Sequence, residues 1–285
     1  MFDFWIILTA CLIAVNSSLL GSFLVLKKMS LIGDALSHAV LPGIVIAFLI
    51  SGEINSFWML IGASSFGIFA IFLIDWLNRV GGFAKDSSIG IIYTLLFAIG
   101  IILITSKAKN ADIDVDCVLF GDINTVPLVN KVLGIPAPTF NLIVISIVSN
   151  FVVLFGLKGF KISSFDKNYA QTLGISIPFW SYLLLGLSSI STVFSFDSVG
   201  AIMVIGLLVI PPSFANIITR KLSLFLLISI SFGVFSCIIG HLIAIFIDIP
   251  TVPTIGVLMG IILILTLIVQ SVNKRLNKNV QPSIE

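Results

Sequence analysis

Residues 24–49 read LVLKKMSLIGDALSHAVLPGIVIAFL. This stretch shows the alternation of long apolar runs with short charged segments that is found along the whole chain. The end of one apolar run is followed by Lys27 and Lys28, and then by a second apolar run. A membrane-spanning helix needs roughly 20 apolar residues, because backbone polar groups that face lipid must be hydrogen-bonded within the segment. The second run also carries Asp34 and His38, which are costly at membrane depth. The stretch therefore predicts two membrane helices, with a polar site in the second.

The composition extends this interpretation to all 285 residues. Apolar residues make up 58% of the chain and charged residues only 10%, against about 25% charged residues in an ordinary soluble domain. The mean hydropathy is +1.21 and the net charge is +2, so the sequence excludes a soluble enzyme, a disordered chain and a nucleic-acid binder. No GxxxxGK[ST] stretch is present to bind ATP. We expect a single transmembrane permease domain over residues 1–285.

The apolar runs predict an all-α, polytopic integral membrane protein with about nine transmembrane helices. Residues 178–218 admit two interpretations, since they hold either two spans or one span and a broken one, which makes eight helices possible. Pro211–Pro212 is expected to kink or unwind the helix that contains it. The predicted spans are 5–26, 29–50, 56–77, 87–106, 140–157, 178–196, 198–218, 222–247 and 250–272.

The positive charges predict the orientation of these spans. When alternate loops are assigned to one side, twelve of the 15 Lys and Arg residues fall on that side and only Lys107, Lys109 and Lys131 fall on the other. Cytoplasmic loops carry the excess of Lys and Arg, so we expect the N-terminus outside and the C-terminus in the cytoplasm. The two long connections are then an external loop, 107–139, and a cytoplasmic loop, 158–177, whose middle is expected to form a short helix ended by Gly174.

The strongest candidate site is the pair formed by Asp34 and His38. Residues four apart lie on one face of a helix, and this pair is expected between the inner surface and the midplane. A carboxylate and an imidazole suit Mn, Fe or Zn. Pro42 lacks an N–H and should free a backbone carbonyl near His38. The spacing is also compatible with an internal ion pair, or with side chains that cap a neighbouring helix, so the residues alone leave these interpretations open.

Other polar residues at membrane depth are weaker candidates. His241 lies about two turns from the outer end of the run 222–247, and it serves either as hydrogen-bonded structure or as a metal ligand in a transport pathway. Asn16, Ser17 and Ser18 lie deep in the first span, where polar side chains usually hydrogen-bond across helices.

Several stretches of the chain resemble one known family. LVLKKMSLIGDALSHAVLPGIVIAFL at 24–49 closely resembles the signature of the manganese/zinc/iron ABC importer permease family. SSIGIIYTLLFAIGIILIT at 87–105, VLFGDI at 118–123, FDKNYAQTLGI at 165–175, SVGAIMVIGLLVIPPSFANIIT at 198–219 and IGHLIAIFIDIPTVPTIG at 239–256 are similar to further parts of it. The resemblance covers nearly the whole chain, and 24–49 is its most specific part.

The resemblance implies a type II importer-like permease in the bacterial plasma (inner) membrane. Family members are homodimers that work with a cytoplasmic ATP-binding subunit and an external metal-binding protein, and they are transport permeases rather than enzymes. The family's metal-coordinating pair falls on Asp34 and His38, which would hold a transported divalent ion (zinc, manganese or iron) and no permanent cofactor. The family's ATPase-coupling loop falls on 165–175, with candidate coupling residues Phe165, Asp166, Ala170 and Gly174.

Three other functions fit the sequence less well. A secondary metal transporter would use the same pair with an ion gradient, and the 165–175 loop argues against it. A permease for metal chelates such as siderophores would have little purpose for an Asp/His pair, because a chelate hides its metal. An intramembrane hydrolase lacks its motif, since neither His38 nor His241 lies in an HExxH context.

Overall fold

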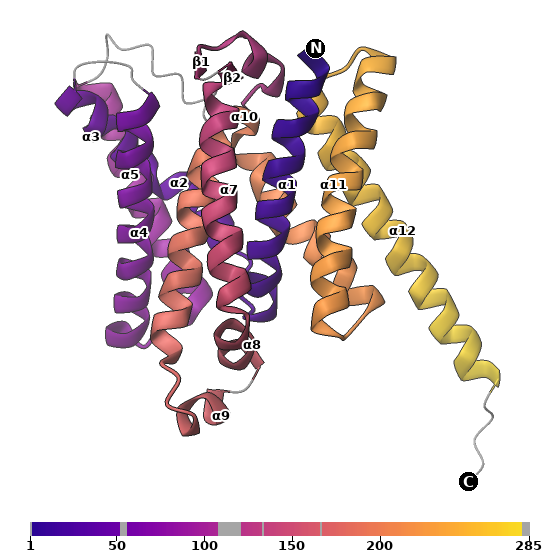
Figure 1. Cartoon of the computed structure of the whole chain (residues 1–285). Coiled ribbons are helices and arrows are strands. Elements are labelled where there is room, and N and C mark those ends of the chain that lie inside the picture. Colours follow the sequence, from indigo (N-terminus) through magenta and orange to yellow (C-terminus); the bar gives the residue numbers. More distant parts are fainter. Residues whose placement is uncertain (1, 52–55, 108–120, 133, 166, 281–285) are drawn as a thin grey trace.

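The computed structural model describes residues 2–51, 56–107, 121–132, 134–165 and 167–280. This part of the chain contains nine helical segments that are long and apolar enough to cross a membrane, and their bounds agree closely with the predicted spans (Figure 1). The helices are α1 Phe2–Leu26, α2 Ile32–Ala39, α3 Leu41–Ser51, α4 Ser56–Gly81, α5 Lys85–Lys107, α7 Ala137–Phe155, α8 Leu157–Phe165, α9 Lys167–Thr172, α10 Ile177–Ile218, α11 Leu222–Ile247 and α12 Thr251–Val280. A 3-10 helix, η1 (Ile123–Leu128), and a two-residue antiparallel ladder of β1 (Lys131–Val132) with β2 (Ile135–Pro136) precede α7.

The long helix α10 contains two spans, because the chain reverses at Gly200. Gly200 has φ 72° and ψ 168°, a conformation that is essentially restricted to glycine. Both ends of α10 lie beside the end of α1: Ser181 accepts a hydrogen bond from the Lys27 ammonium (2.9 Å), and Asn216 lines a cavity together with Leu26. The region 178–218 therefore crosses twice.

The proline pair was expected to kink or unwind this helix, and the structure contradicts the unwinding. Pro211 and Pro212 lie inside the helical part of α10, and Gly200 is its non-helical residue. The turn at Gly200 packs against Gly121, where a Cβ atom would lie 2.1 Å from the Gly200 nitrogen. The irregular backbone thus occurs where another segment of the protein covers it, which satisfies the rule for irregular backbone in membranes.

The bundle has two distinct ends. One, the basic end, carries the cationic side chains at the ends of α1, α4, α8 and α10 and the start of α5, and it lies at the bottom of Figure 1 with α8 and α9. The other, the loop end, carries the start of α1, η1, the β1–β2 ladder, the turn at Gly200 and the α11–α12 connection. The separation of charge predicted from the sequence is thus present. The cations of the basic end are Lys27, Lys28, Arg79, Lys85, Lys158, Lys161, Arg220 and Lys221.

The central helix of the bundle is α1, which packs against α7, α10 and α11. Its middle is held by Asn16, whose amide nitrogen donates to Ser191 of α10 and whose amide oxygen accepts from Ser149 of α7. The predicted hydrogen bonding across helices is confirmed for this residue. In contrast, α12 is little buried and presents large apolar side chains outward, as a lipid-facing helix should.

Candidate functional site

Asp34 and His38 lie on one face of α2, as their spacing predicts. The distance between His38 Nε2 and Asp34 Oδ1 is 3.7 Å, which is too long for a hydrogen bond. The two side chains are partly open, with 28% of the His38 side chain and 47% of the Asp34 side chain exposed. The two side chains therefore lie close together without a hydrogen bond between them, and both could bind a metal ion.

The chain breaks its helix immediately after this pair. Pro42 has no N–H to donate to the His38 carbonyl four residues earlier, so the hydrogen-bond ladder cannot continue there. Accordingly α2 ends at Ala39, the Val40 N–H bonds to the Leu36 carbonyl (3.3 Å), and α3 begins at Leu41. The single predicted span 29–50 therefore consists of two short helices that meet at Val40.

The imidazole of His38 packs against two aromatic rings of α5. Its ring centroid lies 5.7 Å from that of Tyr93 and 5.0 Å from that of Phe97, and its buried Nδ1 has no hydrogen-bond partner among the described residues. Tyr93 and Phe97 lie roughly 12 and 18 Å along α5, whose length is roughly 34 Å, so the pair lies near mid-depth. These two neighbours could not be predicted from the sequence, because aromatic residues are common in any span.

His241 does not join this site. It lies at the loop end, where its Nδ1 is 3.2 Å from the Thr251 hydroxyl and its Nε2 is 4.0 Å from the Asp3 carboxylate. Within the described ranges, no group of three or more His, Cys, Asp and Glu side chains could hold a metal ion. The described residues thus contain two separate carboxylate–imidazole pairs, Asp34 with His38 and Asp3 with His241. The first pair and His241 were predicted from the sequence, and Asp3 was not.

The candidate coupling residues lie at the basic end. Phe165 ends α8, is 59% exposed and lines a cavity of about 350 Å³ with Asn216 and Arg220. Ala170 of α9 is fully buried, and its carbonyl accepts from the Ile175 N–H (2.9 Å). Gly174 (φ 69°) ends this helical segment as predicted, in the left-handed conformation typical of a residue after a helix. Asp166 lies outside the described residues.

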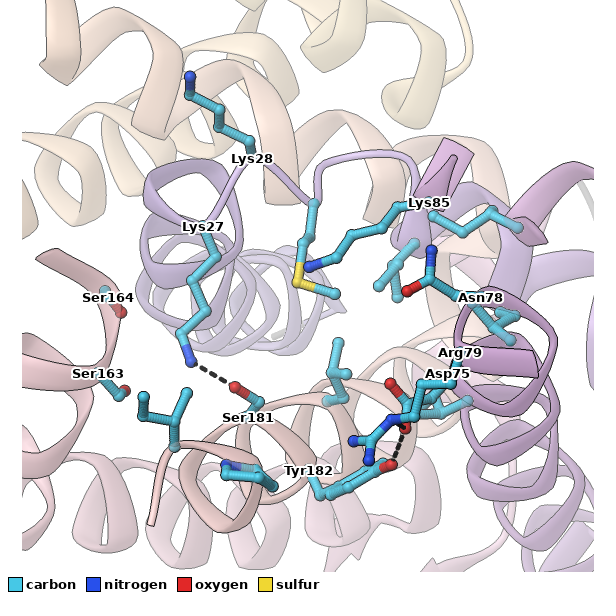
Figure 2. A pocket seen from close by; sticks show the side chains of 18 of the residues that line it. Lys27, Lys28, Asp75, Asn78, Arg79, Lys85, Ser163, Ser164, Ser181 and Tyr182 are labelled. Atoms are coloured by element: carbon cyan, nitrogen blue, oxygen red, sulfur yellow. Dashed lines mark hydrogen bonds and ion pairs between the residues drawn. The ribbon is translucent and has the colours of Figure 1, made fainter. Parts of the chain in front are cut away.

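A second cavity, of about 400 Å³, opens at the basic end between α1, α4, α8 and α10 (Figure 2). Arg79 Nε lies 2.7 Å from Asp75 Oδ2, and the same carboxylate accepts a hydrogen bond from the Tyr182 hydroxyl. Asp75 is the one carboxylate among the described lining residues and is already bonded, so this cavity is a poor metal site. Its other charged lining residues are Lys27, Lys28 and Lys85.

Comparison with known proteins identifies the family of this chain. The profile of the ABC 3 transport family matches residues 1–270. The chain belongs to the ABC 3 transport family. The manganese transport system membrane protein MntD of Bacillus subtilis is 36% identical over 265 residues, which cover 91% of this chain and 89% of that protein. The chelated iron transport system membrane protein YfeD of Yersinia pestis is 31% identical, with 97% and 88% covered.

The fold also matches that of a solved transporter. The structure of PsaBC from Streptococcus pneumoniae in complex with Fab superimposes with a TM-score of 0.78 at 26% identity and covers 93% of this chain and 91% of that chain. With its nine apolar spans, this ABC 3 family member is a multi-pass protein of the bacterial plasma (inner) membrane. It is the membrane-spanning permease subunit of an ABC transport system.

Proposed function

We propose that this permease conducts a free divalent transition-metal ion (manganese, iron or zinc) into the cell, and that Asp34 and His38 bind the ion in transit. The observation that carries the proposal is the carboxylate–imidazole pair itself, near mid-depth and 3.7 Å apart. Ionisable side chains are rare at that depth and mark ion pathways. The nitrogen and oxygen donors are those that these metals accept in proteins.

Two donors make a weak site, and a weak site suits transport. A conducted ion must bind well enough to enter and loosely enough to leave. The chain passes from α2 to α3 at Val40, two residues after His38, so a small rearrangement at this junction would re-aim the pair. The ion is cargo here and not a resident cofactor.

A second copy of the chain completes this site in our proposal. Nearly half of the Asp34 side chain is exposed in the single chain, and a carboxylate that faces lipid at this depth costs several kcal/mol. A homodimer that places two such faces against one central conduit would replace lipid with protein and would supply four donors to one ion. Alternation between outward-open and inward-open arrangements of the two copies would then expose the ion to either side.

The energy comes from a separate ATP-binding subunit at the basic end. The chain carries no P-loop, and membership of the ABC 3 family supports an ATPase partner. The exposed Phe165 and the cavity it shares with Asn216 offer a docking surface, with Ala170 and Gly174 shaping α9 beside it. Positive charge favours the cytoplasmic side, so the basic end faces the cytoplasm and the loop end receives metal from an external binding protein.

Uptake of radioactive manganese by proteoliposomes that contain permease and ATPase tests the site. We expect Asp34→Ala and His38→Ala to reduce ATP-driven uptake at least tenfold while the ATPase still co-purifies. Asp86→Ala, which removes an exposed carboxylate from the first turn of α5, is the matched control and should retain wild-type uptake. Uptake near wild type in both site variants would remove Asp34 and His38 from the pathway.

A chelate is the second candidate cargo, because YfeD carries the name of a chelated iron transport protein. The open carboxylate–imidazole pair favours a free ion, since a chelated metal has its coordination positions filled. Two additions distinguish a free ion from a chelate as the cargo. If the cargo is the free ion, excess unlabelled manganese should abolish uptake of labelled metal, and an excess of metal-free chelator should also stop uptake because it withdraws the ion. Uptake that increases when the chelator is added would favour the chelate.

A further inference from the structure

The loop end contains a buried histidine for which the transport site above has no use. His241 is only 2% exposed, and α11 places its ring beside the start of α1. Its Nε2 has no hydrogen-bond partner among the described residues, and the nearest acidic atom is Asp3 Oδ1 at 4.0 Å. The Asp3 side chain is 69% exposed, so the gap between the two groups is reachable from outside the protein.

The hydrogen bonds on the other side of the ring select its tautomer. The Thr251 hydroxyl donates its one hydrogen to Asn124 Oδ1 at 3.5 Å. With that hydrogen directed to Asn124, the hydroxyl oxygen accepts at 3.2 Å from His241 Nδ1 in the tautomer that is protonated there. In the neutral ring this leaves Nε2 with a free lone pair. The lone pair lies opposite the Asp3 carboxylate.

A lone pair and a carboxylate that face each other at 4.0 Å repel each other, and a cation between them would be attracted to both. We propose that His241 Nε2 and the Asp3 carboxylate bind a divalent transition-metal ion at the loop end, as a reception site through which metal passes before it reaches Asp34 and His38. This inference rests on the proposed function for the order of the two sites. Metal bonds to nitrogen and carboxylate oxygen are about 2.0–2.2 Å long, so one ion bridges a gap of 4.0 Å.

Thr251 and Asn124 act as positioning residues in this arrangement. A metal-binding histidine commonly donates its other N–H to an oxygen that fixes both the tautomer and the ring orientation, and removal of such a partner weakens metal affinity by about 10–100-fold. Asn124 belongs to η1, in the segment that we propose as the receiving surface for the binding protein. In this arrangement an ion first meets the exposed Asp3 and then binds the buried His241, which lies deeper in the protein.

Cobalt binding tests the proposal, because Co²⁺ bound by imidazole and carboxylate has visible absorption that changes with its ligands. The protein is the complete permease–ATPase complex in nanodiscs, carrying Asp34→Ala and His38→Ala so that the transit site is absent. We expect this background to bind one Co²⁺ per chain through the reception site. His241→Gln and Asp3→Asn should each weaken that binding at least tenfold and change the spectrum, and Thr251→Val should weaken it while leaving both ligands in place.

Asp248→Asn is the matched control, because it neutralises another exposed acid at the loop end and asparagine tolerates the left-handed conformation of that residue (φ 58°). It should leave cobalt binding unchanged. Binding that is equal in the background and in both ligand variants would overturn the reception site. Since the readout is binding without the transit pair, failure here leaves the uptake experiment on Asp34 and His38 unaffected, and the reverse also holds.

Discussion

Asn16 of α1 and Ser191 of α10 are hydrogen-bonded in the middle of the bundle, with the Asn16 amide nitrogen as donor. The Asn16 oxygen accepts from Ser149 of α7, so one side chain joins three helices. Asn16 is 1% exposed, and its amide has no water to turn to. The bond therefore fixes the rotation of α1 relative to its neighbours.

Replacement of this amide by a side chain of similar volume should destabilise the bundle. Asn16→Leu removes both interhelical hydrogen bonds, which we expect to cost about 1–2 kcal/mol and to lower the midpoint of thermal unfolding in detergent by roughly 2–4 °C per kcal/mol. Thr94→Val is the control, because Thr94 is exposed and bonds only the Gly90 carbonyl of its own helix. Equal midpoints for the two variants would contradict the role of Asn16.

The reversal at Gly200 should tolerate no side chain. Gly200→Ala forces a Cβ atom into a conformation with φ 72°, and such strain costs on the order of 1–3 kcal/mol. Gly186→Ala in the same helix is the control, because a Cβ atom there meets nothing within 4 Å and alanine favours the helix by about 1 kcal/mol. Thermal unfolding should therefore shift down for the first variant and stay level or rise for the second. A Gly200→Ala protein as stable as wild type would contradict the strained turn.

Metal binding at Asp34 and His38 should weaken as the pH falls. A protonated imidazole has no lone pair, so protons compete with the ion for the site. In a complex carrying Asp3→Asn and His241→Gln, we expect the manganese dissociation constant to rise on acidification. His38→Gln should bind less tightly and show a flatter dependence. A dependence of the same steepness in that variant would assign the competing proton to another group.

The exposed Phe165 should matter for the ATPase and not for folding. Phe165→Ser removes an apolar ring that is 59% exposed, so thermal unfolding of the permease should change little. Its affinity for the ATP-binding subunit should fall at least tenfold, as measured by co-purification over a range of ATPase concentrations. Phe246→Ser, which alters a ring that is 92% exposed near the other end, should leave the complex intact. An unchanged affinity for Phe165→Ser would move the docking surface elsewhere.

The spans were predictable from the sequence because lipid imposes a length and a polarity on every one of them. Lipid does not decide the conformation within a span or in a connection, and the predictions that failed concern those two features. Pro211–Pro212 was expected to kink or unwind the helix, yet both residues stay helical and the non-helical residue of α10 is Gly200. Residues 158–165 were expected in a loop and form α8, in which Ser164 bonds back to the Phe160 carbonyl. The packing of α8 against α7 and α10 decides whether these residues form a helix. A local sequence pattern does not reveal that packing.

The candidate sites divide in the same way. Asp34 and His38 were visible as a pair because one helix turn separates them in sequence and in space. The partner of His241 was not, since Asp3 lies at the far end of the chain and reaches it only through the packing of α1 on α11. Asp3 is also an unremarkable residue by sequence, as acids at the end of a span are solvated. Only the three-dimensional arrangement makes it a candidate ligand.

The hairpin of α10 has a mechanical consequence. Its two tips, at Ser181 and Asn216, stand beside the surface where nucleotide-driven force would be applied, and its bend rests on Gly121 on the far side of the membrane. It also packs along α2, the helix of the transit pair. Because this one hairpin contacts α2 along its length and Gly121 at its bend, we expect a tilt of its two tips to move the proposed metal pair directly.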